Sequence, residues 1–138
     1  MSQNYQEKLK HIKRQNESLI NTLITVSENS VKKATRPVSN SKRETVNEIL
    51  YRVLKEYPYK FRQHELFYEV HVNQRKMDPS ELRIERYLLQ RSDLCKKYGW
   101  GFHGNELGKI ALIEVDSDKY KELLNDQDIN KKKAFNVK

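Results

Sequence analysis

The fold is decided by the stretch Lys96-Lys97-Tyr98-Gly99-Trp100-Gly101-Phe102-His103-Gly104-Asn105-Glu106-Leu107-Gly108-Lys109-Ile110-Ala111-Leu112-Ile113-Glu114-Val115. All four glycines of the 138-residue chain and its only Trp fall inside this stretch. A centre containing Gly and Asn between two apolar runs is typical of a β-hairpin. The sequence therefore predicts strands over about 98–103 and 109–115.

Large and small side chains alternate along the first predicted strand. Because strand side chains point to opposite faces in turn, one face carries the rings of Tyr98, Trp100 and Phe102. The other face carries Gly99, Gly101 and His103. We expect the ring face to be buried in the core, and the glycine face to be bare enough for close approach by a backbone or a ligand.

The remaining patterns predict a single α+β domain in which a small antiparallel sheet is covered by helices. A third strand is expected over about 19–26, and helices are expected near 45–56, 63–75, 79–91 and 117–124. Thr45 and Glu48 have the spacing of a capping box, and Asp78 followed by Pro79 is a helix start. Residues 63–75 also alternate as a strand would, and helix is the favoured interpretation.

The two ends of the chain and one loop are predicted to lie outside the core. Residues 1–18 form a basic helical or frayed arm in which Tyr5, Leu9 and Ile12 keep helical spacing. Residues 27–43 are expected to be a flexible loop, because they contain few apolar side chains. Residues 125–138 are expected to form a basic tail, which leaves 19–124 as the domain.

The formal net charge of +8 is concentrated near the ends. Residues 1–44 carry nine Lys and Arg against four Asp and Glu, whereas residues 45–124 carry fourteen against thirteen. Basic ends attract nucleic acid without sequence preference, so nucleic acid is one candidate partner. The single Cys excludes an intramolecular disulfide, and the chain has neither a secretory signal nor a run near 18 apolar residues. We expect a cytoplasmic protein with no membrane partner.

His71 and His103 are the candidate catalytic or ligand-binding residues, because imidazole titrates near neutral pH. Glu69 shares a face with His71 only if that segment is a strand. Cys95 precedes two lysines and is a weaker candidate nucleophile, for which packing is the favoured role. The chain has no HxH, HExxH or CxxC motif and no phosphate-binding or dinucleotide-binding glycine motif. No metal site and no cofactor are therefore predicted.

Several segments resemble a small, uncharacterised bacterial family that is known only as a domain of unknown function. They are Thr45-Val46, Tyr57-Pro58-Tyr59, Leu66-Phe67-Tyr68-Glu69-Val70-His71, Lys97-Tyr98-Gly99-Trp100-Gly101-Phe102-His103 and Gly108-Lys109-Ile110-Ala111-Leu112. The Tyr-Gly-Trp-Gly-x-His hairpin motif is the most specific of them. The resemblance covers residues 45–124 and implies family membership but no activity, and the basic arm and tail depart from it.

Three classes of function remain open. The leading hypothesis is a binding module for a small molecule or a protein partner, with a site at Gly99, Gly101 and His103 and with His71 alongside. The first alternative is a winged-helix-like nucleic-acid-binding protein, in which Arg83, Arg86 and Arg91 lie on the helix before the hairpin. The second alternative is a small enzyme that uses His71 or His103 as its acid–base group.

Overall fold

The computed structural model describes residues 3–135, without the side chains of residues 3–5 and 85. Residues 1–2 of the predicted arm, residues 136–138 of the predicted tail and the side chain of Tyr5 therefore lie outside the described residues.

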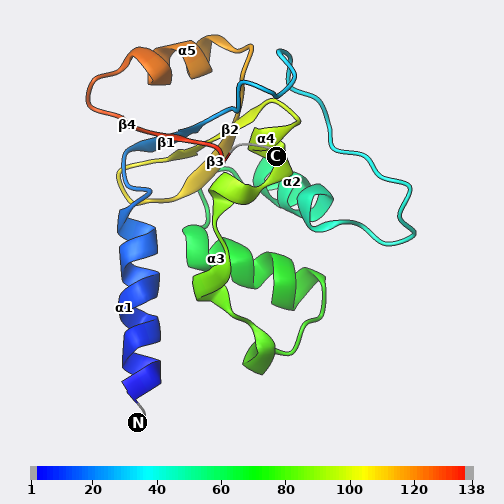
Figure 1. Cartoon of the computed structure of the whole chain (residues 1–138), viewed down its shortest axis with the longest axis vertical. Helices are drawn as coiled ribbons and strands as arrows, with labels where there is room; N and C mark the ends of the chain where they lie inside the picture. Colours follow the sequence, from blue (N-terminus) through cyan, green and yellow to red (C-terminus); the bar gives the residue numbers. More distant parts are fainter. Residues whose placement is uncertain (1–2, 136–138) are drawn as a thin grey trace.

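The centre of the fold is a four-stranded sheet in the order β3-β2-β1-β4. The predicted hairpin is confirmed as β2 (Trp100–Gly104) and β3 (Ile110–Glu114), which pair antiparallel with Trp100 opposite Glu114. β1 (Thr22–Thr25) runs antiparallel to β2 on the other side. β4 (Asn130–Lys133) runs parallel to β1, so the sheet is mixed rather than purely antiparallel (Figure 1).

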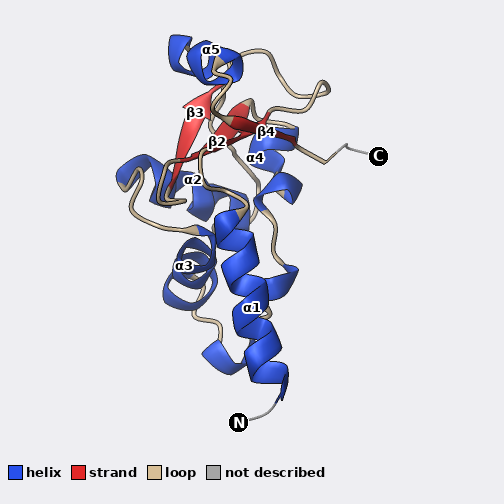
Figure 2. Cartoon of the chain, turned by 90° about the vertical axis from the view of Figure 1, so that its left-hand side faces the viewer, coloured by secondary structure: helices blue, strands red, loops and turns tan. Residues whose placement is uncertain are grey.

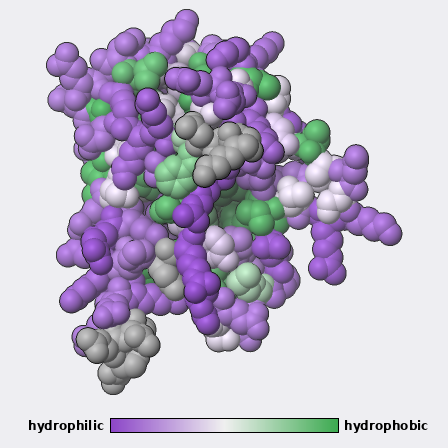
Figure 3. Space-filling model, viewed as in Figure 1, coloured by the Kyte–Doolittle hydropathy of each residue, from purple (hydrophilic) through white to green (hydrophobic). Residues whose placement is uncertain are grey.

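Helices cover both faces of this sheet, which confirms the predicted α+β class. α5 (Asp118–Asn125) lies over one face, and α2 (Val46–Glu56), α3 (Gln63–Tyr68) and α4 (Asp93–Lys96) lie on the other side (Figures 1 and 2). α1 (Gln3–Glu17) extends away from the sheet alongside α3. The face seen in Figure 3 is predominantly hydrophilic, as expected for a chain with 33% charged residues.

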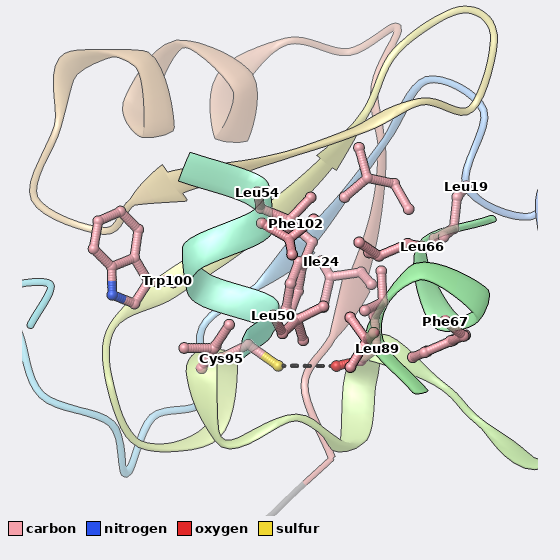
Figure 4. Packing of buried hydrophobic residues seen from close by; sticks show 14 of the residues in the cluster. Leu19, Ile24, Leu50, Leu54, Leu66, Phe67, Leu89, Cys95, Trp100 and Phe102 are labelled. Carbon is pink, nitrogen blue, oxygen red and sulfur yellow. Dashed lines mark hydrogen bonds between the residues drawn. The ribbon is translucent and has the colours of Figure 1, made fainter. Parts of the chain in front are cut away.

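The two faces of β2 carry the side chains that the alternation predicts, and both faces are buried. Trp100 and Phe102 are buried in the larger hydrophobic cluster, against α2 and α4 (Figure 4). The indole Nε1 of Trp100 donates a hydrogen bond to the carbonyl of Thr35 at 2.8 Å. On the opposite face, a Cβ placed on Gly101 would lie 2.9 Å from Cε2 of Tyr120, so α5 packs directly on this glycine.

The predicted capping box of α2 is confirmed. The Thr45 hydroxyl accepts a hydrogen bond from the Glu48 N–H, and the Glu48 carboxylate accepts one from the Thr45 N–H. This pair fixes the start of the helix, so that its apolar stripe faces the sheet. The buried residues of the stripe are Ile49, Leu50, Val53 and Leu54.

The predicted helix over 79–91 is wrong. The chain instead makes three single 3-10 turns, Pro79–Glu81, Ile84–Arg86 and Leu89–Arg91, separated by extended residues. The buried side chains Leu82, Ile84 and Leu89 explain the difference. Their spacings of two and five residues do not place them on one side of an α-helix, so burial of all three requires the backbone to leave helical geometry.

Residues 63–75 are helical, as the favoured interpretation predicts. α3 continues directly into a π-helical turn, η1 (Glu69–Gln74). The wider π turn buries both Val70 and His71. Such turns are rare and are frequently found at functional sites.

The predicted basic tail is wrong for residues 130–133, which form β4. Its three lysines show no apolar alternation, so the strand leaves no signal in the sequence. Its backbone pairs with β1, and the following Ala134 is buried in the core.

The predicted arm and flexible loop also make contacts with the rest of the fold. Lys8 of α1 donates to the carbonyl of Leu82, and Ile12 packs against the larger cluster. In the 27–43 loop, the N–H groups of Val31 and Thr35 donate to the carbonyls of Lys97 and Tyr98.

The closest backbone approach to β2 predicts a strong substitution effect. A Cβ on Gly104 would overlap the backbone carbonyl of Leu19, which cannot rotate away. We expect Gly104→Ala to lower the free energy of unfolding by about 3 kcal/mol, measured by urea denaturation. Glu106→Ala, at an exposed position of the same hairpin, is the control and should change it by less than about 0.5 kcal/mol. Equal effects of the two substitutions would contradict this packing.

Candidate functional site

The glycine face of β2 does not form the open ligand site expected from the sequence. Tyr120 of α5 occupies the space over Gly101. Gly99 precedes the strand at φ +80°, and a Cβ there would lie 3.1 Å from Cα of Ala34. The chain's own atoms therefore fill the space that the two glycines leave.

His103 lies on the same face and has a structural partner. Its Nδ1 is 2.7 Å from the hydroxyl of Tyr59, and the two rings meet edge to face. Burial lowers the pKa of His103, and the nearby Lys119 lowers it further. This hydrogen bond joins the segment after α2 to the sheet.

His71 is the second predicted candidate, and it lies in the π turn among rings rather than beside the sheet. It is 4% exposed and stacks on Tyr87 with 4.4 Å between ring centroids and 17° between planes. Arg75 Nη1 lies 3.2 Å from His71 Nδ1. A guanidinium only donates, so Nδ1 accepts and the imidazole is neutral with its proton on Nε2. Burial lowers the pKa of His71, and the charge of Arg75 adds to this effect.

In the described part of the chain, the predicted acid–base groups form no hydrogen bonds with one another. His71 and His103 have no hydrogen-bond or ring partner in common among the described residues. The Glu69 carboxylate accepts from the side chains of Asn73 and Gln74 instead of meeting His71. Burial raises the pKa of Glu69, but these hydrogen bonds together with the charges of Lys60 and Arg52 lower the pKa overall.

A cavity of about 530 Å³ opens beside His71. Its wall comes from the start of α2, from α3 with η1, and from the irregular segment that precedes α4. Apolar side chains line the cavity together with polar and cationic ones: Val46, Asn47, Leu50, Phe67, His71, Arg75, Arg86, Tyr87, Leu88, Leu89, Arg91 and Ser92. Leu50, Phe67 and Leu89 are buried, so they form its apolar floor.

The rim of this cavity is cationic. Arg75, Arg86 and Arg91 are exposed and line it, and no Asp or Glu is among the lining side chains that the structure describes. None of the three takes part in an ion pair among the side chains that the structure describes. The nearby Asp93 lies 3.9 Å from Lys97 and accepts only a long 3.5 Å contact from Asn47.

Residues from separate hypotheses thus meet in one place. His71 was predicted as a ligand-binding residue, and Arg86 and Arg91 were predicted as nucleic-acid contacts. Arg83, the third predicted arginine, donates to the carbonyl of Ser80 and does not line the cavity.

Sequence reasoning missed Arg75 and Tyr87 as residues of this site. Arg75 follows His71 by four residues, which is the spacing of neighbours on a helix face. This spacing was the available signal. Tyr87 lies within residues 79–91, where a helix is expected from the sequence and separate 3-10 turns are observed.

The Cys thiol and possible metal ligands provide no further candidate site among the described residues. Burial raises the pKa of Cys95 to about 12, and its Sγ lies 3.3 Å from the carbonyl of Ser92, which fits the packing role. No cluster of three His, Cys, Asp or Glu that could hold a metal ion is found within the described residues. Across the same part of the chain, no helix has the length and apolar character needed to cross a bilayer.

The buried imidazoles predict a pH-dependent stability. The ordinary pKa of His is 6.5, and burial lowers the pKa of His64, His71 and His103 in the folded state. Below pH 6.5 the unfolded chain therefore binds more protons, and stability falls as the pH decreases toward the folded-state pKa values. Thermal unfolding between pH 7.5 and 5 should show this fall.

Two histidine variants test whether His71 contributes to the loss of stability at low pH. We expect His71→Gln to flatten the pH dependence, because it removes one group that must stay neutral to fold. His11→Gln, at an exposed position of α1, should leave the dependence unchanged. Identical profiles for the two variants would contradict a neutral, buried His71.

Comparison with known proteins places the chain in a family. A family model described as a family of unknown function, DUF6157, matches residues 13–138. This match extends beyond residues 45–124 and includes β4, so the expected departure of the tail from the family pattern is wrong. Comparison with curated proteins and with solved structures gave no match. The chain belongs to DUF6157, a family of unknown function.

Proposed function

We propose that this protein is a small-molecule-binding module and that its ligand occupies the cavity beside His71. The volume of about 530 Å³ falls within the range of roughly 300–1,000 Å³ typical of ligand pockets. An apolar floor with a few polar groups above it is the usual composition of such pockets.

The observation that carries this proposal is the ring wall of the cavity. His71 stacks on Tyr87, and Phe67 lies within 5.3 Å of Tyr87, measured between ring centroids. Packed rings hold one another in place, so the wall is formed before a ligand arrives. A ligand would therefore bind without paying to order these side chains.

We also propose a bacterial, cytoplasmic setting. The hairpin motif resembles that of a bacterial family, and the free Cys95 thiol fits a reducing compartment.

Neither alternative function is supported by an observation comparable to the ring wall of the cavity. A winged helix needs a recognition helix before its hairpin, whereas residues 79–91 form separate 3-10 turns. β2 is also paired on both sides, so the hairpin is not a free wing. An acid–base enzyme would need an orienting group such as a carboxylate at the imidazole, and no carboxylate bonds His71 or His103 among the described residues.

Filling the cavity tests the proposal. Asn47 is half-buried and lines the cavity from α2, so Asn47→Trp places an indole in the space a ligand would take. Fragments that bind the wild type in saturation-transfer NMR should bind this variant at least tenfold more weakly, a loss of about 1.4 kcal/mol or more.

Asn125→Trp is the matched control, since Asn125 is exposed at the end of α5. It should bind the same fragments as the wild type. Thermal unfolding confirms that both variants fold. Fragments that bind Asn47→Trp and the wild type equally well would contradict this location.

A further inference from the structure

We infer that the ligand of this cavity carries an oxyanion, a phosphate or a carboxylate, on an apolar or aromatic body. This inference rests on the proposed function and adds the chemical class of the ligand. Its starting point is the charge of the cavity lining, whose described side chains include three arginines and no acidic residue.

Uncompensated arginines at a cavity rim need an explanation, because guanidinium groups in proteins commonly pair with carboxylates. Arg75 bonds His71, and the guanidinium of Arg91 lies 5.7 Å from the ring centroid of Phe135. These partners are uncharged, so both arginines retain their full charge. The guanidinium of Arg86 has no hydrogen bond, ion pair or ring partner among the described residues.

Three described acidic side chains that lie close to lining residues in the sequence already have cationic partners. Glu44 forms the ion pair with Arg52, Glu65 is paired with Arg62, and Asp93 with Lys97. An incoming oxyanion would therefore meet three cations, with no acid among the described side chains of the cavity lining. Arginine also suits this role geometrically, since its planar fork of N–H groups matches two oxygens of a phosphate or carboxylate.

His71 lines the same wall and carries no charge. Because its Nδ1 accepts from Arg75, the ring carries its hydrogen on Nε2. The apolar body of the ligand is assigned to the floor of Leu50, Phe67 and Leu89, which offers no polar side chain. Charge at the rim and an apolar floor together select an amphipathic anion over a free inorganic one.

Calorimetric titration with small probes tests this class. Phenyl phosphate and benzoate carry the two oxyanions on a ring, benzyl alcohol is the neutral counterpart, and inorganic phosphate is the head group alone. We expect at least one ring-bearing anion to bind at least tenfold more tightly than both benzyl alcohol and inorganic phosphate. The preferred anion distinguishes a phosphate ligand from a carboxylate ligand.

The chain provides a matched pair of variants. Arg86→Gln should weaken binding of the preferred anion at least tenfold. Arg83→Gln removes the same charge from the same exposed segment but outside the cavity, and it should change binding less than twofold. Both side chains are exposed, so both variants should unfold at the wild-type temperature.

The contrary outcomes are distinct from one another. Equal binding of benzyl alcohol and the anions would overturn the anionic class in favour of a neutral ligand. Equal effects of the two arginine variants would overturn it in favour of non-specific attraction by the overall positive charge. A single-stranded oligonucleotide that binds more tightly than the probes, and is weakened equally by both variants, would overturn it in favour of a nucleic-acid surface. If fragments bind the cavity but no anion does, the inference fails alone; if neither binds, the proposed function fails as well.

Discussion

The packing of Tyr120 on Gly101 is the constraint on which the rest of the structure depends. The ring can approach β2 only because that position has no side chain, and its hydroxyl accepts a hydrogen bond from the N–H of Val26 at 3.0 Å. α5 is thereby fixed to two neighbouring strands. With one face of the sheet closed in this way, Trp100 and Phe102 bury the other face against the helical layer, and no sheet face remains for a ligand.

The candidate site consequently lies where the helical layer is least regular. A π turn places His71 against Tyr87, and two short 3-10 turns present Arg86 and Arg91 at the rim. Continuous α-helix in either segment would distribute these side chains over its circumference at 100° per residue. The irregular backbone and the convergence of chemical groups thus have the same origin, which is a pattern often seen at functional sites.

Features that depend on local periodicity could be predicted from the sequence. The period-2 alternation around Trp100 correctly predicted the burial of Trp100 and Phe102, and Thr45 with Glu48 correctly predicted the start of α2. Features that depend on distant backbone could not. The backbone of β4 pairs with β1, and its Lys side chains form no apolar pattern that would predict a strand. The covering of Gly101 depends on where α5 packs on the sheet. His71, Arg86 and Arg91 were each identified, but only the tertiary structure brings them together.

The central claim is that ligands bind at the helical layer and not at the glycine face of the sheet. Amide chemical-shift mapping of the ¹⁵N-labelled wild type, titrated with phenyl phosphate, tests it most directly. The account predicts that the largest shift changes fall at His71, Arg86 and Arg91, with Gly99 and Gly101 unchanged. Largest changes at Gly99, Gly101 and His103 would contradict it, because they would show that α5 does not close that face.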